Sequence, residues 1–447
     1  MSPHPFPIHG RTRTRLRLLL SQPMVAAAAG LGARMVQLAS TLLIIPVLSN
    51  YLGAEHLAIW LAASSLMDAF SFLDLGIGSH LVNQIAASRD TSSQAQASVS
   101  SAFTVLILFS TLAAALVSLA FVLGAFQFRE PDSSRAFFIT CLTLCLLSPL
   151  SLVWRIRLAL AEMTTQSLWD VMSALGTFCA ILLCVFLDGG MLPAVAAFCI
   201  TPLVVNLLNA RQLFRAHPDI RPRVVFTGKW REMLATLRAG APFLLQNAVR
   251  TISFSFDALL ALNLLPARQA VEFSVLQKMA SAVQTATAVA VNPFWPHFRL
   301  MTAESNRRAA AAVIAGAIGV ALVLSLPISI TLYFFGERLI SLWTRGAITA
   351  PPDLLFALGV WIPVFGIGAA VISLMTIPSL VKLQIKLGII AGLTCLVAKF
   401  IAGRLWGGAG FFYGNTIGLF ALLIIPGLLA ILRSVLGMSR HNPGAEP

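Results

Sequence analysis

Charged side chains are scarce in this chain, since Asp, Glu, Lys and Arg make up 11% of its 447 residues. A soluble domain has about a quarter of its residues charged. This scarcity, together with 58% hydrophobic residues, excludes a soluble globular fold. Histidine and cysteine are also rare. The seven histidines lack ligand spacing and the six cysteines all lie in apolar runs, so neither a metal site nor a disulfide framework is expected.

What the chain does contain is long apolar runs. Runs of about 20 apolar residues recur from Met24 almost to the C-terminus, and such a run crosses a bilayer as a helix. They are too long for the short alternating strands of a membrane barrel. We therefore predict an all-α integral membrane protein with two six-helix lobes related by pseudo-two-fold symmetry. The twelve predicted helices cover 24–49, 56–87, 98–124, 136–154, 167–187, 191–210, 240–263, 269–294, 309–335, 353–377, 384–402 and 409–432.

The positions of Lys and Arg between these helices indicate the orientation of the chain. Cytoplasmic loops carry an excess of both residues. With the N-terminus inside, most of the 31 Lys and Arg residues fall on the cytoplasmic side, among them Arg155 and Arg157. The opposite side receives only Arg129, Arg135, Arg268, Arg338, Arg345 and Arg404. Both termini are therefore predicted to be cytoplasmic.

The same topology accounts for the net charge of +14. Cytoplasmic arginines attract anionic lipid headgroups, so membrane lipids are expected partners and a nucleic acid is not. The one sizeable cytoplasmic segment divides the chain into a lobe of residues 1–215, a basic linker of residues 216–239 and a lobe of residues 240–447. No loop is long enough for a catalytic domain or carries paired carboxylates, so catalytic residues and enzyme activity are not expected.

Several charged residues nevertheless lie inside the apolar runs. A charge at bilayer depth costs about 2.5 kcal/mol or more, so it normally faces a water-filled cavity or a partner and indicates a transport pathway. Lys399 is expected near the outer end of its helix, with its amine at the membrane surface. Asp170 is expected at a helix end, where capping or solvation is usual. The charges inside the runs are Arg34, Asp68, Asp74, Arg250, Asp257 and Lys278.

Polar residues accompany these charges on single helix faces. In the helix predicted over 240–263, a stripe of four lies within about 60° of one face. Such a stripe either lines a cavity or joins two helices, and its cation and anion favour the cavity. The same pattern recurs around Arg34 and Lys278. The stripe contains Gln246, Arg250, Ser253 and Asp257, and the polar neighbours of Arg34 and Lys278 are Gln37, Ser281 and Thr285.

Two motifs resemble a known family. Tyr51-Leu52-Gly53 with Ile59-Trp60, then Leu73-Asp74-Leu75-Gly76-Ile77-Gly78, resemble the opening of the Wzx-type flippases. These are polysaccharide exporters of the multidrug/oligosaccharidyl-lipid/polysaccharide (MOP) superfamily. In the second half, Asp257, Phe273-Ser274 with Lys278, and Pro293-Phe294-Trp295-Pro296 are also similar to that family. The sequence departs from it at Leu265-Pro266, where the family often has Leu-Gly.

The resemblance implies a multi-pass carrier in the bacterial inner membrane. It would move an undecaprenyl-diphosphate-linked oligosaccharide outward by alternating access, alongside polysaccharide polymerase and export proteins. Cations at Arg34, Arg250 and Lys278 suit a diphosphate or an acidic sugar. Carboxylates at Asp68, Asp74 and Asp257 either balance these cations or carry a coupling proton or sodium ion, with no other cofactor expected.

Two other functions fit the same sequence. One is a multidrug exporter of the same superfamily that exchanges organic cations for protons or sodium ions. Three cations in the membrane argue against a cationic substrate, and binding of a lipid-linked sugar rather than a cationic dye would separate the two. The other is a non-transporting scaffold of a glycan assembly complex, which would leave the charges inside the helices unexplained.

Overall fold

The computed structural model consists of helices joined by short turns and connections in the part of the chain that it describes. That part comprises residues 11–68, 76–78, 81–82, 85, 92–124, 131–223, 249, 253–254 and 256–437. The predicted site residues Asp74, Gln246 and Arg250 lie outside the described residues, as does the side chain of Asp68.

The described helices follow the predicted apolar runs. In the first half they are α1 (Arg11–Asp68), α3 (Ser92–Val122), α4 (Pro131–Ala159), α5 (Met163–Phe186), α6 (Met191–Ala216) and the short η2 (Pro218–Ile220). In the second half they are α8 (Asp257–Leu264), α9 (Ala267–Val291), α10 (Phe294–Ala303), α11 (Arg307–Trp343), α12 (Pro352–Leu374), α13 (Val381–Leu419), η3 (Phe420–Ile424) and α14 (Ile425–Gly437).

Eight helical segments within the described residues are long and apolar enough to cross a membrane, whereas twelve crossings were predicted. Part of the difference arises because consecutive crossings form one continuous helical segment. Residues Val381–Gly437, for example, cover both of the last two predicted helices. At 1.5 Å per residue this segment is about 85 Å long, more than twice the thickness of a bilayer core.

Two bends allow such long segments to turn back. The helix α1 bends at Gly53, whose φ of 70° lies in the left-handed region that favours glycine. The helix α13 bends at Trp406 and Gly407, where Gly407 has φ 58°. Beyond that bend the chain packs closely against the first arm of α13. A Cβ on Gly414 would lie 2.6 Å from the backbone nitrogen of Lys399, so only glycine permits this approach.

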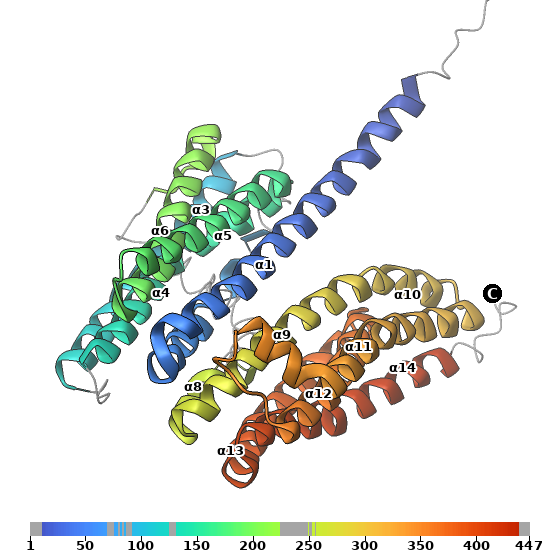
Figure 1. Cartoon of the computed structure of the whole chain (residues 1–447). Helices are drawn as coiled ribbons and strands as arrows, with labels where there is room; N and C mark the ends of the chain where they lie inside the picture. Colours follow the sequence, from blue (N-terminus) through green and yellow to red (C-terminus); the bar gives the residue numbers. More distant parts are fainter. Residues whose placement is uncertain are drawn as a thin grey trace, which may run out of the picture.

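The helices form two groups on either side of α1 (Figure 1). One group contains α3 to α6 and the other contains α8 to α14. The start of α1 and the end of α14 lie on the same side of the molecule, here called the terminal end. The end where α1 bends at Gly53 is here called the bend end, and there Tyr51 contacts Gly190 and Asn50 contacts Thr344.

The two groups are packed together through the bend half of α1. This half, from Ile44 to Met67, shares one hydrophobic cluster with helices of both groups. A hydrogen bond from Asn50 Nδ2 to the carbonyl oxygen of Thr344 (3.2 Å) also joins α1 to the end of α11. Nearer the terminal end α1 is more exposed, with Leu31 at 48% and Met35 at 58%. The lobes are therefore closed at the bend end.

Candidate functional site

The most deeply buried ion pair among the described residues lies in the second lobe. The Nζ atom of Lys399 in α13 is 2.5 Å from Oδ1 of Asp257, the first residue of α8. Lys399 is 0% exposed and Asp257 is 2% exposed. The prediction that Lys399 reaches the membrane surface is therefore wrong. Lys399 instead lies on the face of α13 that packs against Ser253 and Asp257.

Neutral groups provide the remaining hydrogen bonds of this pair. Lys399 also donates to the backbone carbonyl of Ser253, and Asn415 Nδ2 donates to Oδ2 of Asp257 at 3.3 Å. The amine of Lys399 lies 5.4 Å from the ring centroid of Phe254, within the range of a cation–π contact. Two charges removed from water require such compensation. The site is therefore a closed polar cluster inside the lobe.

Ser253 and Asp257 belong to the stripe that was predicted to face a cavity. The structure places both against α13 instead. Ser253 is 1% exposed, and a Cβ on Gly392 would lie 2.8 Å from its hydroxyl oxygen. In this conformation these two residues join helices, the alternative that such a stripe leaves open.

Arg34 is the most accessible of the predicted cations that the structure describes. Its side chain is exposed, and Nη1 donates to Oε1 of Gln37 at 3.0 Å on the same helix. The stretch of α1 from Arg34 to Tyr51 is about 26 Å long, nearly the thickness of a bilayer core. Within this stretch Arg34 therefore lies toward the terminal end, and Tyr51 lies next to the bend at Gly53.

Lys278, Ser281 and Thr285 lie on α9, and all three are half-buried. The hydroxyl of Ser281 donates to the carbonyl of Gln277 at 2.8 Å, and that of Thr285 to the carbonyl of Ser281 at 2.8 Å. Both hydroxyls are thus satisfied within their own helix. They leave their oxygen lone pairs free to accept a further hydrogen bond.

A second polar cluster, at the terminal end of the first lobe, was not predicted. Arg157 is 2% exposed although it was expected as a loop cation. Its Nη1 lies 2.6 Å from Glu162 Oε2, and His217 Nε2 lies 2.7 Å from Oε1 of the same carboxylate. The turn at Ala161 (φ 59°) returns Glu162 to α4. The five-residue spacing of Arg157 and Glu162 across a helix end is the sequence pattern that could have predicted this pair.

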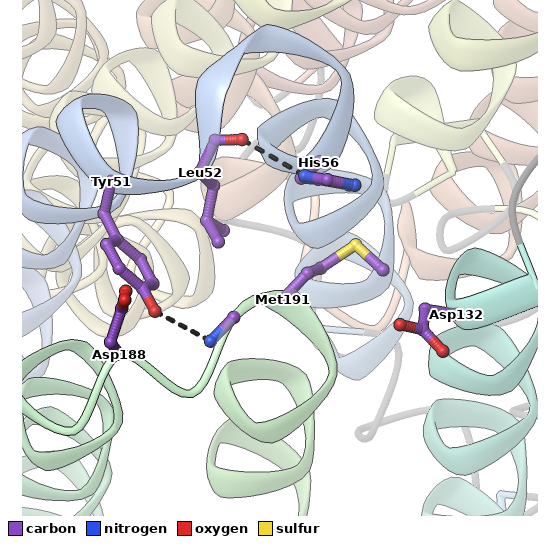
Figure 2. A pocket seen from close by; sticks show the side chains of 7 residues that line it. Tyr51, Leu52, His56, Asp132, Asp188 and Met191 are labelled. Carbon is purple, nitrogen blue, oxygen red and sulfur yellow. Dashed lines mark hydrogen bonds between the residues drawn. The ribbon is translucent and has the colours of Figure 1, made fainter.

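A pocket of about 300 Å³ opens at the bend end of the first lobe. Figure 2 shows Tyr51 beside Asp188, with the Tyr51 hydroxyl accepting a hydrogen bond from the backbone N–H of Gly190 at 2.7 Å. The pocket contains none of the predicted cations, and its volume is at the lower end of small-molecule pockets, too small for an oligosaccharide. Its lining residues are Tyr51, Leu52, His56, Asp132, Asp188, Gly190 and Met191. Within the described residues no group of three or more His, Cys, Asp or Glu side chains is arranged to hold a metal.

Solved structures with a similar fold are transporters. The fold resembles an inward-facing multidrug resistance MATE family transporter of the MOP superfamily, with a TM-score of 0.74 and 15% identity over 94% of this chain and 100% of that one. It equally resembles the lipid II flippase MurJ in an inward closed conformation, with a TM-score of 0.73 and 15% identity over 93% of this chain and 90% of that one. The similarity to an outward-facing MATE family transporter has a TM-score of 0.54, with 14% identity over 93% of this chain and 97% of that one.

At this level of identity the structures establish the fold, and the sequence establishes the family. No curated protein sequence matches the chain. Residues 29–298, more than half of its length, match the family described as polysaccharide biosynthesis protein. This chain therefore belongs to the polysaccharide biosynthesis protein family and has the fold of MOP superfamily transporters.

Proposed function

We propose that this protein is a flippase that moves a polyprenyl-diphosphate-linked oligosaccharide repeat unit from the cytoplasmic to the outer leaflet of the bacterial inner membrane. The observation that carries the proposal is the family match over residues 29–298. The similarity to a lipid II flippase supports it, because that protein has the same fold. The oligosaccharide would then pass to a polysaccharide polymerase or export protein.

The conformation suits the first step of such a cycle. The lobes are packed together at the bend end and α1 is more exposed toward the terminal end. If the termini are cytoplasmic, as the distribution of Lys and Arg predicts, this arrangement opens inward. The higher TM-score with the inward-facing than with the outward-facing MATE transporter, 0.74 against 0.54, supports this orientation.

Arg34 is placed to meet the anionic group of the substrate. An exposed arginine within a membrane helix must face water or an anion rather than lipid tails. In the proposed orientation Arg34 lies toward the inner leaflet, near the depth at which the diphosphate of a lipid-linked sugar sits. Its guanidinium can donate two parallel hydrogen bonds to a phosphate. Lys278 and Arg250 would receive the same group on its way outward.

Ion coupling would act through the buried pair of the second lobe. Asp257 is held by Lys399 at 2.5 Å and by Asn415 at 3.3 Å, so its negative charge is already neutralised. Sodium would have to displace an ammonium group, whereas a proton on Asp257 would release Lys399 directly. We therefore propose a proton as the coupling ion. Release of Lys399 would free α13 to move relative to α8.

The second candidate is an exporter of organic cations. The fold similarity to a multidrug resistance transporter is as high as the similarity to the flippase. The exposed guanidinium of Arg34 disfavours this candidate, because it repels a cationic substrate.

Deletion of the protein, followed by leaflet-specific labelling of lipid-linked oligosaccharide, tests the proposal. We expect the repeat unit to accumulate on the cytoplasmic face and to be cleared by the wild type but not by Arg250→Ala at the same protein level. Unchanged pools of lipid-linked oligosaccharide, with altered sensitivity to cationic compounds, would instead favour drug export.

A further inference from the structure

The helices α1 and α5 lie side by side and run in the same direction. Toward the terminal end, a Cβ on Gly30 of α1 would lie 3.8 Å from the Ser167 hydroxyl of α5. At the bend end, the Tyr51 hydroxyl accepts a hydrogen bond from the backbone N–H of Gly190, just beyond α5. The two contacts fix the register of the helices along the whole width of the lobe.

This register brings Arg34 and Asp170 to the same level. Arg34 lies one helical turn beyond Gly30, and Asp170 lies just under one turn beyond Ser167. The two positions differ by about 1.5 Å along the helix axes. Arg34 is near enough for its charge to act on the Asp170 carboxylate through space, while Arg34 donates to Gln37 and Asp170 accepts from Gln166. Asp170 is therefore within α5 and opposite a cation, whereas the sequence suggested a residue at a helix end.

A chain of hydrogen bonds holds the Asp170 carboxylate from behind. Gln166 Nε2 donates to Asp170 Oδ1 at 2.9 Å, and Asn209 Nδ2 donates to Gln166 Oε1 at 3.1 Å. Arg157 Nε donates in turn to Asn209 Oδ1 at 2.8 Å. Every donor in this chain points toward Asp170. Successive hydrogen bonds of one direction polarise each other, so the chain stabilises an ionised carboxylate in one orientation.

Arg34 and Asp170 differ in how firmly their side chains are held. Asp170 is half-buried and fixed by α5 and α6, whereas Arg34 is exposed on α1 and its guanidinium donates to Gln37 of the same helix. The carboxylate is thus a rigid member and the guanidinium an adjustable one. An anion that approaches from the open side meets Arg34 and can draw it away from Asp170.

We propose that Asp170 is the resident counter-ion of Arg34, which the diphosphate of the substrate displaces on binding. This inference rests on the flippase function proposed above and assigns a positioning residue to it. Asp170 holds the guanidinium ready while the cavity is empty and competes with the diphosphate when it is full. The competition weakens binding, which allows release on the far side. It also selects anionic lipids, because a neutral lipid cannot displace a carboxylate.

Binding of undecaprenyl diphosphate to the full-length protein in nanodiscs at low salt tests the proposal. The variants are Asp170→Asn, Arg34→Gln and the double variant, with undecaprenol as the uncharged control lipid. Asn keeps the acceptor for Gln166 and removes only the charge. Asp188→Asn, at the other end of the same lobe, is the matched control.

We expect Asp170→Asn to tighten binding of undecaprenyl diphosphate about tenfold, because the carboxylate no longer competes with the diphosphate for the guanidinium. In the Arg34→Gln background the same change should have no effect, because the cation that Asp170 opposes is absent. Asp188→Asn should have no effect in either background. An equal effect of Asp170→Asn in both backgrounds would overturn the proposal.

Failure of the flippase function and failure of the counter-ion proposal can be distinguished. If the wild type binds undecaprenyl diphosphate no better than undecaprenol, the proposed substrate is wrong. Thermal unfolding without ligand then tests the pairing in a double-mutant cycle, which compares the wild type, the two single variants and the double variant. A coupling between Arg34 and Asp170 in that cycle would support the pairing, and strictly additive shifts would overturn it.

Discussion

Lys399 and Asp257 are 142 residues apart in the sequence, yet they form an ion pair of 2.5 Å that is closed off from solvent. The pair joins the start of α8 to the middle of α13, about two helical turns before the bend at Trp406 and Gly407. A membrane protein tolerates two buried charges only when each satisfies the other. The stability of the second lobe therefore depends on this pair.

Breaking one side of the pair should destabilise the second lobe strongly. Lys399→Met leaves Asp257 buried without its cation, and Asp257→Asn leaves Lys399 without its anion. Removing one partner of a buried pair costs about 3 to 5 kcal/mol. We expect both variants to unfold at markedly lower temperature in detergent, measured by fluorescence of the purified protein.

The double variant Asp257→Leu with Lys399→Met separates charge pairing from packing. It removes both charges and leaves apolar side chains of similar size, so its unfolding temperature should recover toward that of the wild type. If proton coupling runs through the pair, the double variant should fold and yet fail to transport. A double variant as unstable as the single ones would contradict the assigned pairing.

Glycine at position 414 should be essential for the hairpin made by the two arms of α13. In Gly414→Ala the new methyl group would meet the backbone of Lys399 at 2.6 Å, and backbone atoms cannot move aside. We expect a loss of folded protein, measured by the monodisperse fraction in size-exclusion chromatography. The control is Gly388→Ala on the same helix, where a Cβ meets nothing within 4 Å. Equal yields for the two variants would argue against the close approach.

A cross-link between Asn50 and Thr344 should lock the transporter. These residues join the lobes at the bend end, where Asn50 Nδ2 lies 3.2 Å from the carbonyl oxygen of Thr344. The experiment uses the double variant Asn50→Cys with Thr344→Cys, in a chain whose six native cysteines are replaced by Ala. A short thiol cross-linker that joins the two introduced thiols should block transport, because the lobes can no longer separate at this end.

A matched pair within one lobe controls for the chemistry of this cross-link. Gly30→Cys with Ser167→Cys joins α1 to α5 within the first lobe, where a Cβ on Gly30 would lie 3.8 Å from the Ser167 hydroxyl. This cross-link should leave transport nearly unchanged, and reduction of a cleavable linker should restore the blocked pair. Transport that continues with Asn50→Cys and Thr344→Cys fully linked would show that the lobes do not separate there.

The Arg157–Glu162 contact should stabilise the terminal end of the first lobe. Arg157 donates to Glu162 at 2.6 Å, to Asn209 at 2.8 Å and to Gln212 at 2.9 Å. Lysine cannot reproduce this fork of donors, so Arg157→Lys should lower the unfolding temperature nearly as much as Arg157→Ala. Arg155→Lys provides the comparison on the same helix. Full rescue by lysine would mean that charge alone, rather than the donor geometry, holds the cluster.

The all-α membrane fold could be predicted from the sequence because the apolar runs are long enough to cross a bilayer. The charged residues within these runs could be identified because charges are scarce there. The depth of Arg34 could not, since it depends on where α1 bends. Gly53 sets that position, and a single glycine within a long apolar run gives no distance by itself. Arg34 lies about 26 Å before Tyr51 along α1, and its role as a cation that binds substrate stays a prediction.

The partner of Asp257 could not be predicted either. Sequence patterns identify which face of a helix is polar, but not which distant helix it meets. Lys399 was assigned to the membrane surface because it lies near the end of an apolar run. The bend at Trp406 and Gly407 returns the chain past Lys399, and the close approach of the two arms depends on Gly414. Three-dimensional packing, rather than hydropathy, decides the environment of this lysine.

The most direct test of the account is a flipping assay with purified protein in proteoliposomes. The substrate is an undecaprenyl-diphosphate-linked oligosaccharide with a fluorescent sugar, and a membrane-impermeant quencher reports the leaflet. The account predicts that wild-type protein makes label from both leaflets accessible, that Arg34→Gln slows this about tenfold, and that undecaprenol-linked fluorophore is not moved. Equal movement of the charged and the uncharged lipid, or none by well-folded wild-type protein, would contradict it.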